Sequence, residues 1–195
     1  MTTGDLRRFT ETHPPAPGVR EAPPELLVAY RGRLPGGLLQ LWEEDGLGWY
    51  GDGLIQLIDP RDYASLLSGW LMQDEPDPSR TPVALSAFGQ ILYHRALGEG
   101  AEDFSLLDPH GRSVQVLAWS LTATFNELLC DPSATETLLG APLQRQAAQK
   151  LGPLAEDESY FFVPALALGG ARELRFVQKG NALVHLTFLL DLTRA

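Results

Sequence analysis

Glycine and proline interrupt this sequence so often that it can hold only short helices and short strands. The 195 residues include 19 glycines and 15 prolines, without the period of a fibrous protein. Proline breaks helix interiors, and glycine favours turns and helix ends. Hydrophobic residues still make up 44% of the chain, which is enough for a buried core at this length. We therefore expect an α+β fold of two small lobes, each a short antiparallel sheet packed with helices.

The breaks divide the chain into three predicted parts. Residues 1–23 form a proline-rich leader that begins with a helical turn and continues as extended chain. Residues 24–73 form a first lobe, and residues 82–195 form a second lobe. The turn-rich sequence MQDEPDPSRTP contains the boundary between the two lobes.

Local signals in the first lobe predict helices around a hairpin. The sequence LPGGLLQLWEEDG predicts a helix that Pro35 opens and Gly46 ends. Two short strands follow, joined by a turn at residues 51–53. Asp59 is then the expected N-cap of a helix whose apolar residues recur with helical spacing.

The second lobe begins with strands and continues mainly with helices. We expect about four antiparallel strands between residues 82 and 120. Beyond them, the expected helices cover residues 121–131, 133–139, 142–151 and 182–192, and the expected strands cover residues 160–163 and 174–178.

Charge and cysteine content exclude several classes of protein. There are 25 acidic residues against 15 lysines and arginines, which gives a net charge of −10. This balance argues against direct binding to nucleic acid and suits a basic macromolecular partner. The single cysteine, Cys130, excludes an intrachain disulfide framework and a cysteine-based zinc site.

The sequence carries no signal for secretion or membrane insertion. The first residues, MTTGDLRRFTETHPP, lack the apolar run of a signal peptide. No stretch approaches the roughly 20 apolar residues that a membrane-spanning helix needs. We expect a cytoplasmic protein with no membrane partner.

No catalytic constellation emerges from the residues. The four histidines, His13, His94, His110 and His185, lack the spacing of a helical metal site and are read as surface or packing residues. Cys130 lies near the predicted end of a helix, where the helix dipole disfavours a reactive thiolate. Neither a phosphate-binding glycine loop nor a nucleophile elbow is present. We predict no catalytic residue, no bound metal and no cofactor.

The sequence from LPGGLLQLWEEDG to DPRDY resembles the GAD-like domain. The residues that carry this resemblance are Gly32, Leu34, Pro35, Leu38, Leu39, Trp42, Gly46, Gly53, Leu54, Pro60 and Tyr63. The second lobe resembles the C-terminal domain of type VI secretion immunity proteins of the DNase-immunity type. Its matching stretches are Phe88-Gly89, Gly152-Pro153-Leu154, Asp157-Glu158, Tyr160, Phe162, residues 164–170 and His185-Leu186. Together the two resemblances run from about Pro24 to Leu192.

The resemblance implies a protein that binds a secreted toxin and neutralises it in the cell that makes both. For a nuclease toxin, an acidic protein could cover the basic surface that holds phosphate. The candidate partner-binding residues are the acids Glu43, Glu44, Asp45, Asp52, Glu156, Asp157 and Glu158, with Trp49 and Tyr50 as aromatic anchors.

Two alternatives remain open on sequence grounds. One is a small enzyme that reverses the modification that a toxin makes. Its carboxylate site would contain Asp157 and Glu158, together with His185. The other is a regulatory or binding module, such as a copy that no longer has a toxin.

Overall fold

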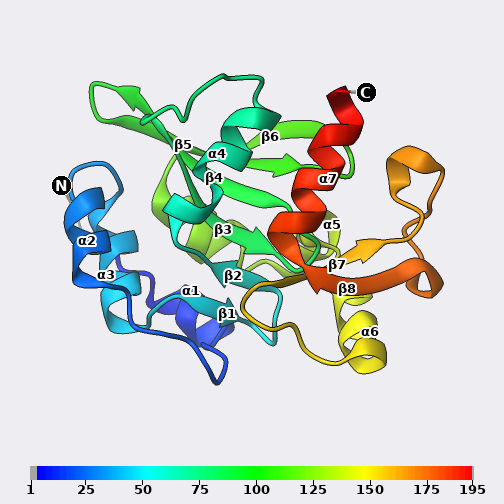
Figure 1. The fold of residues 1–195 in the computed structure, drawn as a ribbon. Coiled ribbons are helices and arrows are strands. Elements are labelled where there is room, and N and C mark those ends of the chain that lie inside the picture. Colours follow the sequence, from blue (N-terminus) through cyan, green and yellow to red (C-terminus); the bar gives the residue numbers. More distant parts are fainter. Residues whose placement is uncertain (1–3, 195) are drawn as a thin grey trace.

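A six-stranded antiparallel sheet forms the centre of the protein, and a two-stranded sheet lies beside it (Figure 1). The structure is a computed structural model, and it describes residues 4–194. The mixed α+β class predicted from the sequence is confirmed. Among the described residues, no helix has the length and apolar character needed to cross a membrane.

The elements are short, as the glycine and proline content predicts. The α-helices are α1 (Arg7–Thr12), α2 (Pro24–Tyr30), α3 (Gly36–Glu44), α4 (Pro60–Trp70), α5 (Pro132–Leu139), α6 (Ala141–Leu151) and α7 (Ala182–Arg194). A π-helical turn, η1 (Ala123–Leu128), and two 3-10 turns, η2 (Leu166–Leu168) and η3 (Leu174–Phe176), complete the helical elements. The strands are β1 (Gly48–Tyr50), β2 (Ile55–Leu57), β3 (Arg80–Ser86), β4 (Ile91–Gly98), β5 (Ala101–Asp108), β6 (Ser113–Ala118), β7 (Glu158–Phe162) and β8 (Val177–Asn181).

The large sheet is a meander in which each strand pairs with the next along the chain. Its order is β1-β2-β3-β4-β5-β6, and Figure 1 shows it rising from β1 at the bottom to β6 at the top. Strand β2 precedes the turn-rich sequence and β3 begins in its last three residues, and Ile55 of β2 is paired with Ser86 of β3. One sheet therefore continues from the predicted first lobe into the predicted second lobe. The proposed domain division remains a prediction.

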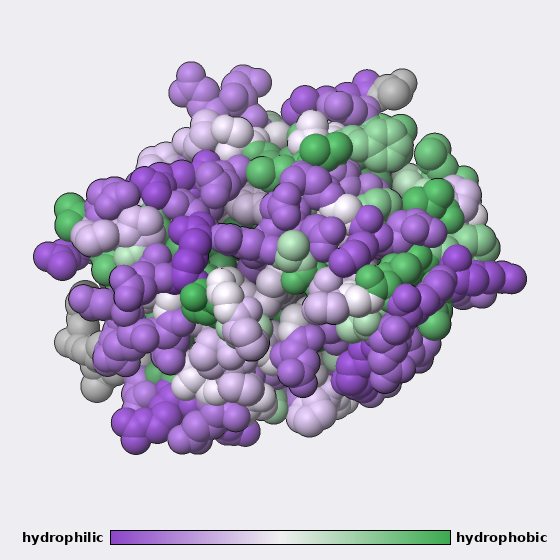
Figure 2. Space-filling view, turned by 60° about the horizontal axis from the view of Figure 1, so that its bottom comes forward, coloured by the Kyte–Doolittle hydropathy of each residue, from purple (hydrophilic) through white to green (hydrophobic). Residues whose placement is uncertain are grey.

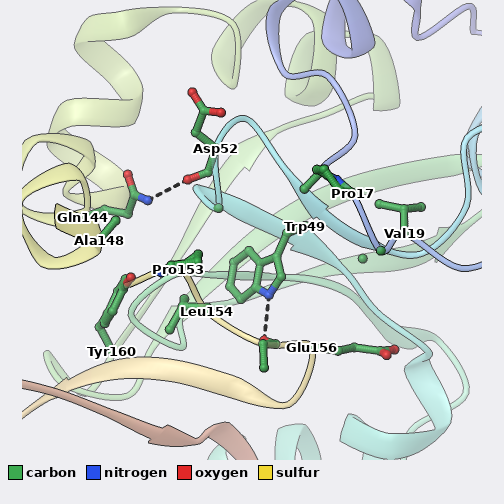
Figure 3. Close-up of a pocket in the computed structure, with 15 residues that line it drawn as sticks. Pro17, Val19, Trp49, Asp52, Gln144, Ala148, Pro153, Leu154, Glu156 and Tyr160 are labelled. Atoms are coloured by element: carbon green, nitrogen blue, oxygen red, sulfur yellow. Dashed lines mark hydrogen bonds between the residues drawn. The ribbon is translucent and has the colours of Figure 1, made fainter. Parts of the chain in front are cut away.

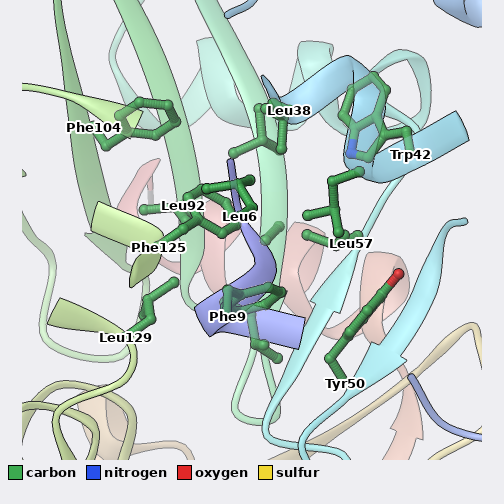
Figure 4. Close-up of a cluster of buried hydrophobic side chains, with 14 of the residues drawn as sticks. Leu6, Phe9, Leu38, Trp42, Tyr50, Leu57, Leu92, Phe104, Phe125 and Leu129 are labelled. Atoms are coloured by element: carbon green, nitrogen blue, oxygen red, sulfur yellow. The ribbon is translucent and has the colours of Figure 1, made fainter. Parts of the chain in front are cut away.

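The leader is part of the folded core. Phe9 on α1 has no exposed surface, and Figure 4 shows it among the buried side chains next to Tyr50 and Phe125. The Phe9 ring centroid is 5.7 Å from that of Tyr50 and 5.1 Å from that of Phe125. Farther along, the backbone N–H of Ala16 donates to the Trp49 carbonyl at 2.8 Å. The leader thus packs inside the fold and also covers the outer edge of β1.

Helix α4 shows how local sequence sets an element that then packs against distant ones. The Asp59 carboxylate accepts the backbone N–H of Arg61 at 3.0 Å, which confirms the predicted N-cap. The apolar side of α4 packs with Leu186 and Leu190 of α7 in a second core cluster. Gly69 permits this contact, since a Cβ there would lie 2.7 Å from Leu190 Cδ2. Together, α4 and α7 cover one face of the sheet (Figure 1).

The segment predicted as an α-helix over residues 121–131 is instead wound mainly as the π-helical turn η1. The backbone N–H of Leu129 donates to the Thr124 carbonyl at 2.9 Å, a spacing of five residues. Asn126 in this turn accepts the backbone N–H of Phe9 at 3.1 Å and donates to the Asp5 carbonyl at 2.6 Å. The turn therefore holds the leader, a contact that helical periodicity alone does not reveal.

Candidate functional site

A pocket with a volume of about 540 Å³ opens beside β1. Figure 3 shows Trp49 in the middle of its lining, with Pro17 and Val19 of the leader on one side and Leu154 and Tyr160 on the other. Most of the lining is apolar, and the carboxylates of Asp52 and Glu156 belong to exposed residues at its margin. We call this the Trp49 pocket. It combines an apolar interior with an acidic rim.

Hydrogen bonds from side chains to the backbone hold the walls of the Trp49 pocket together. Trp49 Nε1 donates to the Ala155 carbonyl at 2.9 Å, and Gln144 Nε2 donates to the Asp52 carbonyl at 2.9 Å (Figure 3). Tyr160 donates its hydroxyl to the Gly152 carbonyl at 2.6 Å. Each bond satisfies a backbone carbonyl that a loop would otherwise present to solvent or leave unpaired. The pocket is therefore formed before any partner arrives.

A smaller and more acidic pocket of about 280 Å³ adjoins the Trp49 pocket, and Glu156 lines both. Its other acidic residues are Asp59, Asp62 and Asp157. The Arg61 guanidinium binds Asp59, and hydrogen bonds from Arg61 hold the pKa of this carboxyl below its usual value despite its burial. Asp62 and Asp157 are exposed. The exposed carboxylates of Asp52, Asp62, Glu156 and Asp157 thus form an acidic margin along the two pockets.

One arginine reduces the negative charge of this margin. Arg20 Nε donates to Glu156 Oε1 at 2.5 Å, and both side chains remain substantially exposed. A surface ion pair of this kind contributes about 0–1 kcal/mol to stability. A basic side chain of a partner can therefore compete with Arg20 for Glu156 at little cost to the fold.

The structure brings some of the predicted binding residues together and separates others. Trp49, Asp52 and Glu156 line the same pocket, and Asp157 lies in the adjoining one. Glu158 accepts the backbone N–H of Ala155 at 2.9 Å and an ammonium proton of Lys179 at 3.2 Å, so its carboxylate is engaged within the chain.

Tyr50 lies in the core. Its side chain has no exposed surface, and its hydroxyl donates to the Gly46 carbonyl at 2.8 Å. Burial raises the pKa of this hydroxyl well above its usual value. In this structure Tyr50 supports the strand that carries Trp49.

The acids at the end of α3 belong to a different surface. Glu44 and Asp45 line a pocket of about 260 Å³ with α1, and this pocket shares no residue with the Trp49 pocket. Glu43 beside them is exposed. Partial burial, together with the nearby charge of Glu44, raises the pKa of Asp45. The predicted acidic residues thus fall into two separate groups.

The histidines pack or form hydrogen bonds within the fold. His13 Nε2 lies 2.7 Å from the Leu129 carbonyl, and His110 Nε2 lies 3.0 Å from that of Phe88. The His185 ring stacks on Phe161 with a centroid separation of 4.1 Å. Within residues 4–194, no group of three or more histidine, cysteine or acidic side chains is arranged to hold a metal ion.

Residues that complete the site had no recognisable signal in the sequence. Gln144 and the leader residues Ala16–Val19 line the Trp49 pocket, and Arg20 and Asp62 line its acidic neighbour. Sequence reasoning identified Asp59 only as a helix cap. The proline-rich character of the leader predicted extended chain, but not the wall against which that chain packs.

Comparison with protein families gives two matches along the chain. Residues 6–101 match the GAD-like domain. Residues 121–193 match the C-terminal domain of the type VI secretion (T6SS) immunity protein Tdi1. The two families and their order are those that the sequence resembles. Phe88 and Gly89, which the resemblance assigns to the second family, lie inside the GAD-like match.

The fold is also similar to a solved structure. The crystal structure of Atu4351 from Agrobacterium tumefaciens superposes with a TM-score of 0.72, over 95% of this chain and 88% of that one. Sequence identity is 18%, so this similarity concerns the fold alone. A search of curated proteins finds no match.

Proposed function

We propose that this chain acts as a type VI secretion immunity protein. Along the chain, a match to the GAD-like domain is followed by a match to the C-terminal domain of the immunity protein Tdi1. The second match carries this proposal, and it supports a role in binding a toxin. We propose binding of the toxin rather than catalysis as its mode of action.

We further propose that the toxin is a nuclease and that its basic surface docks over the Trp49 pocket. A nuclease must attract phosphate, and its binding surface is therefore positively charged. The net charge of −10 favours rapid association with such a surface. Occupation of that surface by this protein would exclude nucleic acid.

The Trp49 pocket suits this role better than the acids at the end of α3. It provides about 540 Å³ of mostly apolar space in which a partner's side chain can be desolvated. Asp52, Glu156 and Asp157 surround that space and its neighbour with exposed carboxylates. Interfaces with a desolvated centre and a charged rim combine affinity with fast association.

A pair of charge-matched triple variants tests the docking site. The first carries Asp52→Asn, Glu156→Gln and Asp157→Asn, and the control carries Glu43→Gln, Glu44→Gln and Asp45→Asn. Each removes three negative charges. Asparagine also tolerates the left-handed backbone of Asp52, where φ is 56°.

We expect the first variant to bind the toxin at least about tenfold more weakly and to show a shallower dependence on salt, because rim charges act mainly on association. The control should stay within about threefold of the unmodified protein. The toxin for this measurement is the product of the gene immediately upstream of the gene for this protein. It is used once two results are in hand: it kills host cells, and this protein protects those cells. Equal losses in the two variants would reject the Trp49 pocket as the docking site. Failure to bind or protect would reject the immunity role itself.

A further inference from the structure

The smaller pocket beside the Trp49 pocket already holds a cation that belongs to the chain itself. We call it the acidic pocket, since its lining includes the carboxylates of Asp59, Asp62, Glu156 and Asp157. Arg20 lines it as well, and Arg20 Nε donates to Glu156 Oε1 at 2.5 Å. The Arg20 guanidinium therefore shows which kind of group this pocket accepts.

One carboxylate of the acidic pocket is neutralised within the chain, and others are not. Arg61 binds both oxygens of Asp59, with Nε at 3.0 and 3.1 Å and Nη2 at 2.6 Å. Asp62 and Asp157 are exposed. Asp157 accepts a hydrogen bond of 3.1 Å from the neutral amide of Asn181, which leaves its charge uncompensated. Asp62 and Asp157 thus offer negative charge to a second cation.

A buried amide in the wall of the acidic pocket points to a ligand that donates hydrogen bonds. Gln56 lines the pocket and is only 3% exposed. Its Nε2 donates to the Glu156 carbonyl at 2.5 Å, whereas its Oε1 is buried with no hydrogen-bond partner among residues 4–194. A buried acceptor without a donor is costly. A guanidinium, with its planar fork of N–H donors, can bind carboxylates and an amide oxygen at the same time.

Tyr63 in the same wall responds to the negative charge of the pocket. Burial raises the pKa of its hydroxyl, and Asp62, Asp157 and Glu156 raise it further, to about 12. These three acids therefore act together on one place in the structure. Such a concentration of negative charge favours a cation there.

The Arg20 side chain can leave the acidic pocket without unfolding its own segment. The backbone groups of Arg20 and Leu47 exchange two hydrogen bonds of 2.9 and 2.8 Å, which hold the segment while the side chain rotates. The side chains of Arg20 and Glu156 are 40% and 56% exposed, and exposed ion pairs are weak. Glu156 can therefore exchange Arg20 for another cation.

One partner surface can cover the acidic pocket and the Trp49 pocket together, because Glu156 lines both. Figure 3 shows the Glu156 side chain extending away from Trp49. Strand β1 lies at the bottom of Figure 1, and Figure 2 turns that side forward, where hydrophilic residues cover much of the surface. A charged side chain that approaches from this side remains in hydrophilic surroundings until it reaches the pocket.

We propose that an arginine of the toxin enters the acidic pocket and replaces Arg20 at Glu156. Arg20 is then an internal competitor, which occupies the carboxylate until the toxin arrives. This inference rests on the proposed function, because it names the group of the toxin that the site receives. Its consequence is that removal of a side chain from the site strengthens binding.

Arg20→Met tests the competition, with Arg7→Met as the matched control. Arg7 is also an exposed arginine of the leader, its Nη2 lies 3.5 Å from Asp5 Oδ2, and it lines neither pocket. Each variant removes one positive charge, so both change the long-range attraction of a basic toxin alike. We expect Arg20→Met to bind the toxin at least about threefold more tightly than Arg7→Met does, and Arg20→Lys, which keeps the charge, to stay within about twofold of the unmodified protein. Equal affinities of the two methionine variants, or weaker binding of Arg20→Met, would overturn the proposal.

A double-variant cycle shows whether Arg20 acts through Glu156. In a Glu156→Gln background Arg20 has lost the carboxylate for which it competes. We therefore expect Arg20→Met to change the affinity for the toxin by less than about 1.5-fold in that background. A gain of the original size there would mean that the competition takes place elsewhere, and the proposal would be wrong.

A free arginine analogue separates this inference from the proposed function. The probe is N-acetyl-arginine methylamide, and its binding is followed by NMR at the side-chain amide of Gln56, with the corresponding lysine compound as the comparison. We expect Arg20→Met to bind the arginine probe at least about threefold more tightly than the unmodified protein does, and more tightly than it binds the lysine compound. If Arg20→Met binds the probe but no toxin, the proposed function is wrong and the pocket still receives a guanidinium. If the probe leaves the Gln56 amide unchanged, the inference is wrong even if the toxin binds.

Discussion

We expect Phe9→Ala to lower the free energy of unfolding by about 3–5 kcal/mol, the usual cost of removing a buried phenylalanine ring. Phe9 is fully buried between Tyr50 and Phe125, which join the leader to β1 and to η1. Small domains have a total stability of about 5–15 kcal/mol, so this change removes a large part of it. The effect is expected even though Phe9 lies in the proline-rich leader, outside both predicted lobes.

Urea unfolding followed by tryptophan fluorescence measures this effect. Val28→Ala is the control, because Val28 is 66% exposed on α2 and its truncation should cost less than about 0.5 kcal/mol. A loss below about 1 kcal/mol for Phe9→Ala would show that the leader does not pack as described.

The second large effect is a loss of stability as the pH falls from about 6.5 to about 4. Burial and the nearby His110 lower the pKa of His185 to about 4. Burial also lowers the pKa of His94 and of His110, although Glu102 and Asp108 respectively oppose that change. An unfolded histidine binds a proton near pH 6.5. The unfolded chain therefore takes up protons in this range while the folded chain does not, and acid favours unfolding.

The shift of His185 alone corresponds to a loss on the order of 3 kcal/mol between these pH values. His94 and His110 act in the same direction. Carboxyls with a lowered pKa, such as that of Asp103 beside Arg95, lose their contribution below about pH 5, where the unfolded carboxyl begins to bind protons. The range between about pH 6.5 and 5 therefore reports mainly on the histidines.

Urea unfolding at pH 7, 6, 5 and 4.5 checks this prediction, with His185→Phe as the informative variant. His185 Nε2 is buried without a hydrogen-bond partner, so phenylalanine removes no hydrogen bond at that atom and retains a ring for stacking on Phe161. We expect the variant to lose less stability than the unmodified protein between pH 7 and 4.5. Identical slopes would exclude His185 as a source of the pH dependence.

Sequence patterns located elements whose signals are local. Helix α4 was predictable because Asp59, Pro60 and the apolar spacing after them lie within a few residues of one another. The hairpin of β1 and β2 was predictable for the same reason. The pairing of β2 with β3 was not, because the turn-rich sequence between them is also typical of a linker between domains.

The candidate site was partly predictable. Composition and the family resemblance directed attention to Trp49, Asp52 and Glu156, which line one pocket. The bonds that form the pocket, from Trp49 to Ala155 and from Gln144 to Asp52, connect positions about a hundred residues apart. Such contacts leave no periodicity in the sequence. Tyr50 and its neighbour Trp49 are both buried, but they pack in different core clusters: Tyr50 in the main one and Trp49 in the one that contains Tyr160.

The packing of the leader also sets the order of events when the protein is made. Phe9 and His13 bond to Asn126 and Leu129, and Arg20 pairs with Glu156. A ribosome that adds about 5–20 residues per second needs several seconds or more to reach these partners after it has made the leader. The leader thus waits, with Phe9 lacking its Phe125 neighbour, until more than a hundred further residues have been made. Translation must therefore pass Tyr160 before the Trp49 pocket exists.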